Sequence, residues 1–462
     1  MKSITRTSRR QFVKRTLAGA AGIIAMPAIV PSSVFGANAP SNRIQVAHIG
    51  CGRISTSMDM PGVLRQDIAR VVALCDLDSK RLARAKAMVE KHYKGAVTVK
   101  TFGDYRELLQ DPGIDAVAIS TPDFWHSEPV VAAALAGKDV YVQKPLSMTI
   151  HEGRQVSDTV TAKKRAFQIG SQQRSDSPWP QFRRACELVR NGRLGQLTTV
   201  KVGLPIDPPG GDPTPMPVPA NLNYTMWLGW SPEEPYTEER VHPQDSITGR
   251  PGWLRIEPYT LGMITAWGSH HVDIAHWGMG TELTGPIEIE GKGVFPTKGL
   301  WNVHGAYHVE MKYANGVTLM IDNKFPNGVR FEGDEGWLFV TRDGAGVTPS
   351  DPAASGTKAL AASKASILKS EIKPDEIHLY KSADQHLNWL QSIQSRQRAA
   401  TTPEIAHRST SACEVAWISM KLGRKLRWNP DKEEFVGDAE ANAMRSRPQR
   451  PPYGTDNILK SA

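Results

Sequence analysis

Several patterns that would assign this chain to common functional classes are missing. Its four cysteines are widely spaced, and neither C-x-x-C nor H-E-x-x-H occurs. This argues against a cysteine metal site, a redox pair and a zinc protease. No repeat of fixed period is present, and the apolar stretch at residues 17–30 is short and broken by Pro27. That stretch is unsuited to anchor the protein in a membrane.

The first 36 residues differ in charge from the rest of the chain. They hold six basic and no acidic residues, and SRRQF at residues 8–12 matches a twin-arginine export signal that precedes the apolar stretch. We therefore expect cleavage near residues 34–37 and export to the periplasm by the twin-arginine machinery. The alternative is a basic disordered arm in front of the fold.

Removing this segment changes what the composition implies. Subtracting its six charges from the formal net charge of +9 leaves +3 for the remaining 426 of the 462 residues. The positive balance therefore does not indicate a nucleic-acid partner, and the length suits two domains with full cores. A twin-arginine substrate folds in a reducing compartment, so we expect Cys51, Cys75, Cys186 and Cys413 to be free thiols.

The stretch IQVAHIGCGRIS at residues 44–55 predicts a dinucleotide-binding turn. An apolar strand runs into Gly50-Cys51-Gly52, and Ser55 takes the third glycine position of G-x-G-x-x-G. Glycines allow the tight turn and the approach of a pyrophosphate to the following helix. A second apolar strand ends in Asp76, whose carboxylate suits ribose hydroxyls and disfavours NADP, so NAD is expected. A glycine turn in another α/β unit, with Asp76 as a helix cap, is the alternative.

Strands and helices alternate through residues 42–165, which predicts a doubly wound parallel sheet of the α/β class. One predicted strand, residues 115–120, opens onto the loop TPDFWH at residues 121–126, and another, residues 139–143, leads into Lys144-Pro145. A lysine at the carboxyl end of a parallel strand lies where ligands of such sheets bind, and desolvation beside a cationic nicotinamide would lower its pKa. A surface lysine before a turn is the alternative.

The motifs GCGRIS, TPDFWH and VYVQKPL, in this order, resemble the Gfo/Idh/MocA oxidoreductases, which include glucose-fructose oxidoreductase and inositol dehydrogenase. The resemblance implies a Rossmann NAD-binding domain and a catalytic role for Lys144, with Gln143 in place of the usual glutamate. The cofactor-binding residues that it implies, together with the glycine motif, are Gly50, Gly52, Arg53, Ile54, Asp76, Thr121, Pro122, His126, Lys144 and Pro145.

Residues 262–277 are predicted to form one helix that carries the second half of the site. Ala266, His270, Asp273 and Trp277 would share a stripe, with His271 beside it. In the family the matching helix presents an aspartate and, four residues later, a histidine; His270 matches the histidine, but Ala266 replaces the aspartate. Asp273 and His271 are the candidates to compensate, although Asp273 matches a second aspartate of the family whose role looks structural. Adjacent histidines diverge by about 100° on a helix, which disfavours a metal site.

Polar and aromatic side chains near the expected cleft are candidates for substrate binding. Arg174 follows the predicted strand at residues 166–170, and an aromatic-rich irregular region contains Tyr224 and Arg255. Aromatic rings can stack on sugar faces, although packing of long loops explains them equally well. The full set of substrate candidates is Arg174, Tyr224, Arg255, Trp267, His271 and Asp273, and no metal ligand is predicted.

From residue 286 the pattern changes to alternating strands, at residues 287–294, 306–313, 317–323, 329–332 and 337–341, with a hairpin signal at Asn315-Gly316. They predict a second, α+β domain over residues 166–427 with a large, mostly antiparallel open sheet. Such a sheet favours a homodimer or homotetramer. The proline-containing tail at residues 428–462 is expected to pack as an extended arm.

Three functions are compatible with these features. The first is an exported oxidoreductase that moves hydride between a hydroxyl of a sugar, sugar acid or glycoside and tightly held NAD, with Lys144 and His270 shuttling the proton. The second is a redox-neutral glycosidase or lyase that passes through a transient keto-sugar. The third is a sugar-binding or sensor protein without catalysis, which the replacements at Ala266 and Gln143 motivate.

Overall fold

The computed structural model describes residues 43–342 and 358–461, so the predicted export signal lies outside the described residues. The first of two sheets has the strand order β3-β2-β1-β4-β5-β6, and all its pairs are parallel. Its strands are β1 Ile44–Ile49, β2 Ala69–Cys75, β3 Lys100–Phe102, β4 Ala116–Ile119, β5 Asp139–Val142 and β6 Phe167–Ile169. The chain reverses its direction of winding between β1 and β4, which confirms the predicted doubly wound sheet.

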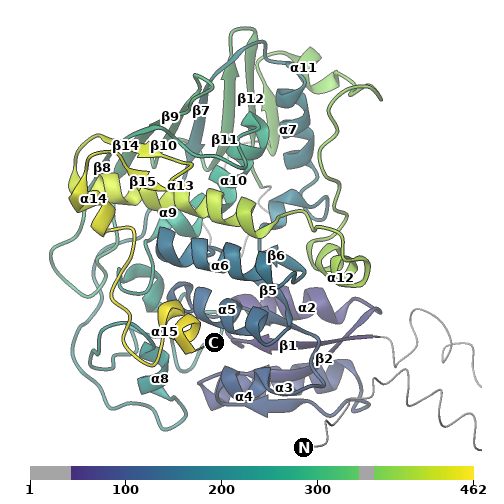
Figure 1. The fold of residues 1–462 in the computed structure, drawn as a ribbon, viewed down its shortest axis with the longest axis vertical. Coiled ribbons are helices and arrows are strands. Elements are labelled where there is room, and N and C mark those ends of the chain that lie inside the picture. The colour runs from purple at the N-terminus through teal and green to yellow at the C-terminus, as the bar shows by residue number, and fades with distance from the viewer. Residues whose placement is uncertain (1–42, 343–357, 462) are drawn as a thin grey trace, which may run out of the picture. The chain divides into compact units, whose positions relative to one another are not determined.

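Both faces of this sheet are covered because successive strand side chains point to opposite sides. Val46 belongs to one hydrophobic core and Ala47 to the other. The helices around the sheet are α2 Met60–Leu64, α3 Ser79–His92, α4 Tyr105–Leu109, α5 Ser127–Leu135, α6 Ile150–Ala162 and α12 Gln385–Ser395. Figure 1 shows α5 and α6 beside the sheet, with α12, a later segment, near α2.

The second sheet has nine strands in the order β13-β12-β11-β7-β10-β9-β8-β14-β15. Its pairs are antiparallel except β7 with β10, and the hairpin between β9 and β10 turns at Gly316, whose φ is +85°. The predicted mostly antiparallel sheet is therefore confirmed. Its strands are β7 Leu197–Gly203, β8 Glu288–Gly293, β9 Tyr307–Lys312, β10 Thr318–Asp322, β11 Gly328–Gly333, β12 Gly336–Val340, β13 Leu360–Ala362, β14 Leu426–Asn429 and β15 Glu434–Phe435.

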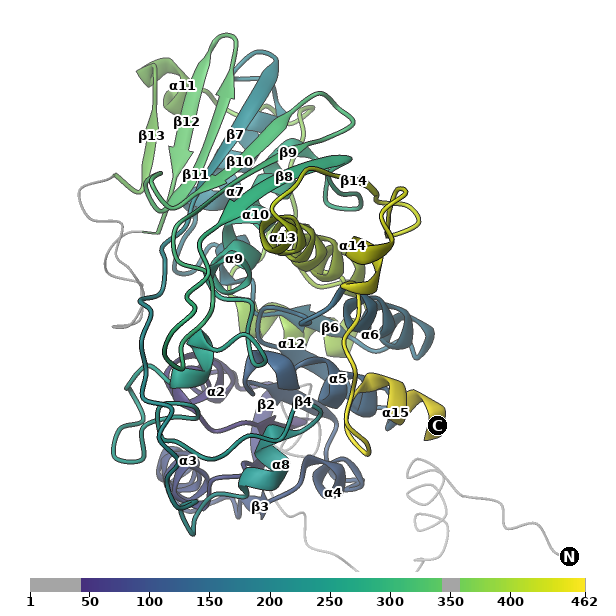
Figure 2. The same ribbon diagram turned by 90° about the vertical axis from the view of Figure 1, so that its left-hand side faces the viewer.

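Three helices lie against one face of this sheet, as Figure 2 shows: α7 Gln181–Arg190, α10 Gly268–Met279 and α13 Pro403–Leu422. The longest, α13, begins where the Thr402 side chain accepts a hydrogen bond from the amide of Ile405 and ends at Gly423, which has a φ of +63°. These are ordinary helix start and stop signals. Most of α13 is buried because it packs on both β8 and α6.

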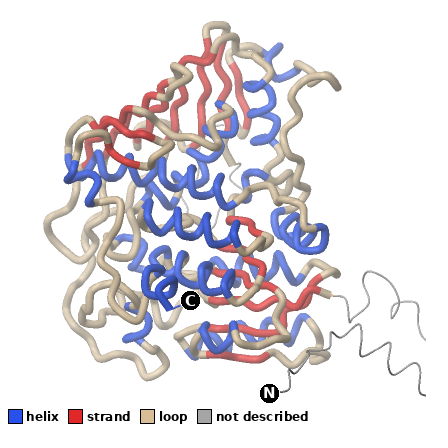
Figure 3. Tube along the Cα trace, viewed as in Figure 1, coloured by secondary structure: helices blue, strands red, loops and turns tan. Residues whose placement is uncertain are grey.

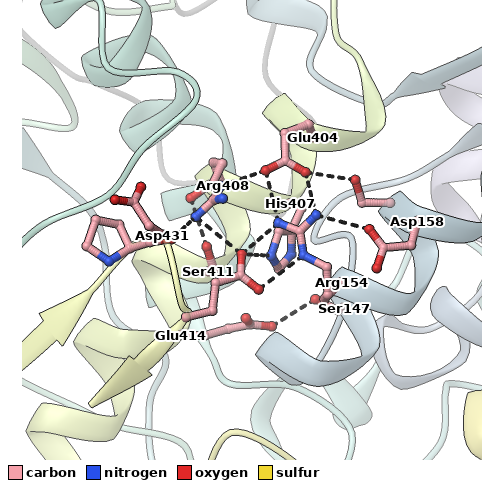
Figure 4. A network of polar contacts seen from close by, with 12 residues as sticks. Ser147, Arg154, Asp158, Glu404, His407, Arg408, Ser411, Glu414 and Asp431 are labelled. Carbon is pink, nitrogen blue, oxygen red and sulfur yellow. Dashed lines mark hydrogen bonds and ion pairs between the residues drawn. The ribbon is translucent and has the colours of Figure 1, made fainter. Parts of the chain in front are cut away.

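A polar network joins α6 to α13 and to the chain after β14 (Figure 4). Arg154 of α6 pairs with Glu404 and with Glu433, at 2.7 Å in each case. His407 Nε2 lies 2.6 Å from the Glu433 carboxylate, and the Ser147 hydroxyl donates to Glu414 at 2.9 Å. Since α13 contacts β8 of the second sheet and β6 of the first, and α6 packs on α5, these contacts help to hold the two sheets in one compact unit.

Much of the chain between β7 and α10 is loop, drawn in tan in Figure 3. It contains the short helix α8 Tyr224–Leu228. The remaining helices are α9 Met263–Ala266, α11 Ala365–Lys369, α14 Ala439–Ala443 and α15 Thr455–Ser461. No helix among the described residues is both long and apolar enough to cross a membrane. All four cysteines are buried and free, as expected.

Three expectations need correction. The helix predicted at residues 262–277 is two helices, α9 and α10, which meet at Trp267. Strand β6 pairs with β5 in the first sheet, so that sheet extends beyond the predicted boundary at residue 165. The tail after residue 427 is more than an extended arm, because β14 pairs with β8 and two helices follow. Burial of Trp428 and Phe435 explains why this segment joins the sheet.

Candidate active site

A cavity with about 1530 Å³ of space among its lining atoms lies at the carboxyl ends of β1, β2, β4 and β5. This is the edge where open parallel sheets bind ligands, at the point where the strand order reverses. Residues from the loop before α9, from α9 and α10, and Arg342 after β12 line the same cavity. The cavity extends from the glycine turn after β1 to Lys144 after β5 and on to His270 of α10, so one continuous space joins these groups.

The glycine turn after β1 has the form that a pyrophosphate needs. Gly50 has a φ of +87°, and a Cβ there would lie 2.7 Å from the carbonyl oxygen of Ser120. At Gly52 the nearest atom to an added Cβ is Arg81 Nη1, at 3.8 Å, so the space in front of its backbone stays open. A helix starts at residue 53 and runs to Leu64, with a π-helical turn at Ser55–Asp59. Its N-terminus faces the cavity, which suits an anion.

Asp76, at the end of β2, is held by two backbone amides. Its carboxylate accepts from the amide of Cys51 at 2.6 Å and from that of Asp78 at 2.8 Å. Burial raises the pKa of Asp76, and the two amides, His242 and Arg81 counteract that rise. These bonds orient the carboxylate beside the glycine turn, where the family's ribose hydroxyls are expected.

A segment of the irregular region before α9 closes this end of the cavity. The Ser79 amide donates to the carbonyl of Asn221 at 2.8 Å, and the Asn223 amide donates to that of Leu77 at 2.9 Å. His242 Nε2 lies 2.9 Å from the Asp78 carboxylate, and His242 and Leu77 both line the cavity. The second half of the chain therefore walls the end of the cavity near Asp76. No sequence motif predicted that this segment would lie against the cofactor end of the cavity.

At the other end, the loop after β4 and the turn after β5 are joined by His126. Its Nδ1 lies 2.6 Å from the carbonyl oxygen of Pro145 and its Nε2 lies 3.0 Å from that of Thr121. Burial lowers the pKa of His126 to about 4, and the two carbonyls oppose that shift. Because Lys144 precedes Pro145, this contact fixes the backbone that carries the lysine into the cavity.

The structure explains why residue 143 is glutamine. Its Nε2 donates to both carboxylate oxygens of Asp59, at 2.9 and 3.0 Å. Asp59 is fully buried and also accepts from the Ser120 hydroxyl at 2.7 Å, with His386 Nε2 at 3.1 Å. A glutamate at position 143 would place a second carboxylate against this one, which is costly without a shared proton.

His270 and Trp267, from the junction of α9 and α10, line the same cavity as Lys144. His270 is 5% exposed, and burial, Arg342, Lys144 and His271 lower its pKa well below the usual value, so its imidazole is neutral. Within residues 43–342 and 358–461, its buried Nδ1 has no hydrogen-bond partner. The Trp267 ring lies edge-on to His270, with centroids 5.8 Å apart, and Arg342 lies over Trp267 at 4.8 Å. A ligand hydroxyl can satisfy this nitrogen.

Eleven of the predicted site residues line the cavity together: Gly50, Gly52, Arg53, Ile54, Asp76, Thr121, Pro122, His126, Lys144, Trp267 and His270. Pro145 contributes through its carbonyl bond to His126 instead. Several lining residues were not predicted: Asp123, Arg81, Met226, Trp227, His242, Trp253 and Arg342. Asp123 lies inside the TPDFWH motif, so the sequence offered a signal for it. The others come from α3, from α8 and from the irregular segments of the second half of the chain, where no motif marks them.

The structure places Arg174 and Asp273 in the core, outside the cavity lining. Arg174 is 2% exposed, and its Nε and Nη2 donate to Asp273 at 2.7 and 2.8 Å. Its Nη1 donates to Glu282 at 2.6 Å, and its guanidinium lies 4.8 Å from the Trp277 ring. Asp273 also accepts from two serine hydroxyls. These groups satisfy one another's charges and hydrogen bonds within the core.

His271, Tyr224 and Arg255 also lie outside the cavity lining. His271 is held between Asn327, at 2.8 Å, and Gln173, at 3.3 Å. The Tyr224 hydroxyl donates to the carbonyl oxygen of Glu234 at 2.9 Å. Arg255 lies 4.3 Å from the Trp301 ring. Their aromatic and polar groups pack the long loops, which was the alternative for this region.

The strand order, the glycine turn and the acidic residue after β2 define a Rossmann dinucleotide-binding protein with a second α/β domain. The chain belongs to the Gfo/Idh/MocA oxidoreductase family. Residues 44–171 match its NAD-binding Rossmann fold, and residues 211–345 and 361–455 match its C-terminal alpha/beta domain. The resemblance noted in the sequence is thereby confirmed.

Named relatives share parts of this chain. The chain is 32% identical to myo-inositol 2-dehydrogenase of Thermotoga maritima over 178 residues, 38% of this chain and 47% of the relative. It is 31% identical to glycosyl hydrolase family 109 protein 2 of Shewanella sp. (strain ANA-3) over 166 residues, 33% of this chain and 36% of the relative. It thus spans less than half the length of either protein.

Solved structures show the same fold. The WlbA dehydrogenase from Bordetella pertussis, in complex with NADH and UDP-GlcNAcA, is similar with a TM-score of 0.59 and 16% identity. The match covers 84% of this chain and 98% of that one. The fold of both domains is therefore shared, while the low identity leaves the substrate open.

Proposed function

We propose that this protein is an NAD-dependent oxidoreductase that acts on the CH–OH group of a sugar, a sugar acid or a glycoside. The observation that carries the proposal is the shared cavity: the glycine turn and Asp76 form one end, and Lys144 and His270 form the other. Carbohydrate as the substrate class is supported by the inositol dehydrogenase relative and by the sugar nucleotide in the WlbA complex.

The residues have separable roles in this reaction. The turn at Gly50 and Gly52, the helix that follows and Asp76 hold the dinucleotide, whose nicotinamide supplies hydride acceptance when bound. The neutral His270 accepts or donates a hydrogen bond through Nδ1 and orients the substrate hydroxyl. Lys144 takes the hydroxyl proton as the carbonyl forms. Trp267 and Trp227 give apolar surface against which a sugar ring packs.

Asp76 is proposed to select NAD over NADP. Replacing Asp76 with alanine removes the charge that would repel a 2′-phosphate, and Arg81 on the same wall then becomes available to it. We expect the ratio of NAD to NADP affinity to fall at least about tenfold. Titration of each cofactor by quenching of tryptophan fluorescence measures this ratio. An unchanged ratio would show that Asp76 does not contact the ribose.

We also propose export by the twin-arginine route with the cofactor already bound. The SRRQF segment supports the route, and the wall formed by Asn221, Asn223 and His242 supports slow loss of the cofactor, since it must open for release. Substituting lysine for both Arg9 and Arg10 should retain the protein in the cytoplasm in cell fractionation. A homodimer or homotetramer is part of the proposal, and sedimentation velocity tests it.

Redox-neutral glycoside cleavage is the second candidate, favoured by the similarity to the family 109 glycosyl hydrolase. In that reaction a transient keto group acidifies the neighbouring C–H, elimination expels the aglycone, and the hydride returns. The same cavity residues serve the first step. Release of aglycone without accumulation of reduced cofactor would identify this candidate.

The deciding experiment is the ultraviolet spectrum of the purified mature protein, before and after a panel of sugars, sugar acids and glycosides. A reduced-nicotinamide band with one of them supports the oxidoreductase, and product analysis separates it from the glycosidase. Binding of carbohydrate without any spectral change or product would favour a binding or sensor protein. If the protein neither contains nor binds a dinucleotide, the proposal fails.

A further inference from the structure

The cavity lacks the carboxylate that its family relatives place four residues before the histidine. Ala266 occupies that position and lines the cavity at 8% exposure. His270 cannot replace the carboxylate as a proton acceptor, because burial and the neighbouring Arg342, Lys144 and His271 keep its pKa far below neutrality. A hydroxyl proton taken by Lys144 therefore has no evident destination on the α9–α10 side of the site.

Asp123, in the loop after β4, offers a carboxylate in the same cavity. It begins the short 3-10 turn Asp123–Trp125 after β4, lines the same cavity as Lys144, and is only 4% exposed. The Thr260 hydroxyl donates to its Oδ2 at 2.8 Å, and Thr260 is itself fully buried. The amide of Gly262 donates to the Thr260 hydroxyl oxygen at 3.2 Å and helps to aim it. The carboxylate is thus held by a partner from the other half of the chain.

The electrostatic surroundings of Asp123 suit proton exchange near neutral pH. Burial raises the pKa of Asp123 to about 6, opposed by Lys144, by the Thr260 hydrogen bond and by Arg250. The neutral His270 and the cationic Arg342 line the same cavity. A group whose pKa lies close to the working pH can both accept and return a proton efficiently.

We propose that Asp123 is the proton-accepting partner of Lys144 and takes the place of the carboxylate lost at Ala266. This inference rests on the proposed function, since it assigns a further residue to the same reaction. Asp123 acts through Lys144, so its role is to receive the proton and to hold the lysine charge in the cavity.

The hydroxyl proton of the substrate reaches Asp123 through Lys144. The O–H bond of the substrate breaks as its proton passes to Lys144 Nζ, while one Nζ proton moves to the Asp123 carboxylate and forms its O–H bond. Lys144 ends in the state in which it began. With a nicotinamide held by the glycine turn and Asp76, the electron pair of the substrate C–H bond would depart as hydride, and the O–H electron pair would form the carbonyl. In the reverse direction Asp123 returns the proton by the same path.

Two variants test this assignment. Asp123→Asn keeps the size and the hydrogen bond to Thr260 but cannot take a proton, and we expect single-turnover cofactor reduction at neutral pH to slow by about 10²-fold or more. Thr260→Val keeps the carboxylate but removes the hydrogen bond that lowers the Asp123 pKa. The acid limb of the rate profile should then move to higher pH by about one unit. Asp67→Asn, on an exposed loop, is the matched control.

The protonation of Asp123 can also be measured without substrate, which makes this test independent of turnover. Infrared titration of wild type minus Asp123→Asn should isolate one carboxyl that protonates near pH 6. The subtraction removes other buried carboxyls such as Glu128 and Glu152, whose pKa values burial raises to about 7. The same band should shift to higher pH in Thr260→Val. Retained dinucleotide binding and an unchanged melting temperature show that the variants are folded.

The outcomes separate this inference from the proposed function. If wild type reduces its cofactor with a carbohydrate and Asp123→Asn does so equally fast, or if no carboxyl titrates in the difference spectrum, Asp123 is a structural residue and the inference is overturned while the function stands. If none of the carbohydrates causes wild type to reduce its cofactor, the proposed function fails and the inference fails with it. A slow Asp123→Asn with an unshifted Thr260→Val profile also overturns it.

Discussion

Replacing Lys144 with methionine is expected to slow hydride transfer by about 10²–10⁴-fold while leaving the dinucleotide bound. Methionine keeps much of the volume of the lysine stem, so the wall of the cavity stays filled, but it cannot receive the hydroxyl proton. Stopped-flow measurement of reduced-cofactor absorbance in a single turnover gives the rate. Absorbance of the released dinucleotide gives the occupancy.

Lys86→Met is the control for this variant, because Lys86 lies half-buried on α3, away from the cavity lining, and pairs with Glu90 at 3.7 Å. It should leave both the rate and the occupancy unchanged. If Lys144→Met lost the cofactor instead of the rate, Lys144 would be a binding residue, and the proton-transfer role would need another group.

Breaking the Arg174–Asp273 pair is expected to cost about 3–5 kcal/mol of unfolding free energy. Arg174→Leu leaves the Asp273 carboxylate fully buried with only the Ser171 and Ser409 hydroxyls as partners. Two-state denaturant unfolding monitored by tryptophan fluorescence measures the loss. A variant of normal stability with a raised KM for carbohydrate would instead support the substrate role predicted for Arg174 and Asp273.

The double variant Arg174→Leu, Asp273→Leu should be less destabilised than the sum of the two single variants. Each single change leaves one charge buried without its partner, whereas the double change removes both charges together. Additive losses would mean that the two residues do not interact in the folded protein.

The cost of Arg174→Leu should depend on pH. Burial raises the pKa of Asp273, but Arg174 and the two serines outweigh burial, so the folded pKa lies below the usual value. The pair therefore stabilises wild type above about pH 4, and that stability is lost as pH falls through the depressed pKa. Without Arg174, burial raises this pKa, so acid protonates the carboxyl and narrows the stability gap between variant and wild type.

Local sequence determined the cofactor end of the site and most strands. The turn at Gly50 needs a positive φ and no side chain against Ser120, which only glycine allows. The Gly50-Cys51-Gly52 motif therefore predicts the turn from the sequence alone. The strands β8 to β12 show alternating or apolar patterns over five or six residues, so they were predicted to within about one residue of their bounds. The glycine turn and the strands are determined by residues that are close to one another in the sequence.

Only the tertiary structure decided which polar residues face the cavity. Arg174, Asp273 and His271 have the types expected of a sugar site, but each is saturated by residues at least 56 positions away, such as Asn327 for His271. Asp123 and Thr260 meet across 137 positions. A polar side chain joins the site or the core according to the partners that folding brings to it, and no local pattern encodes those partners.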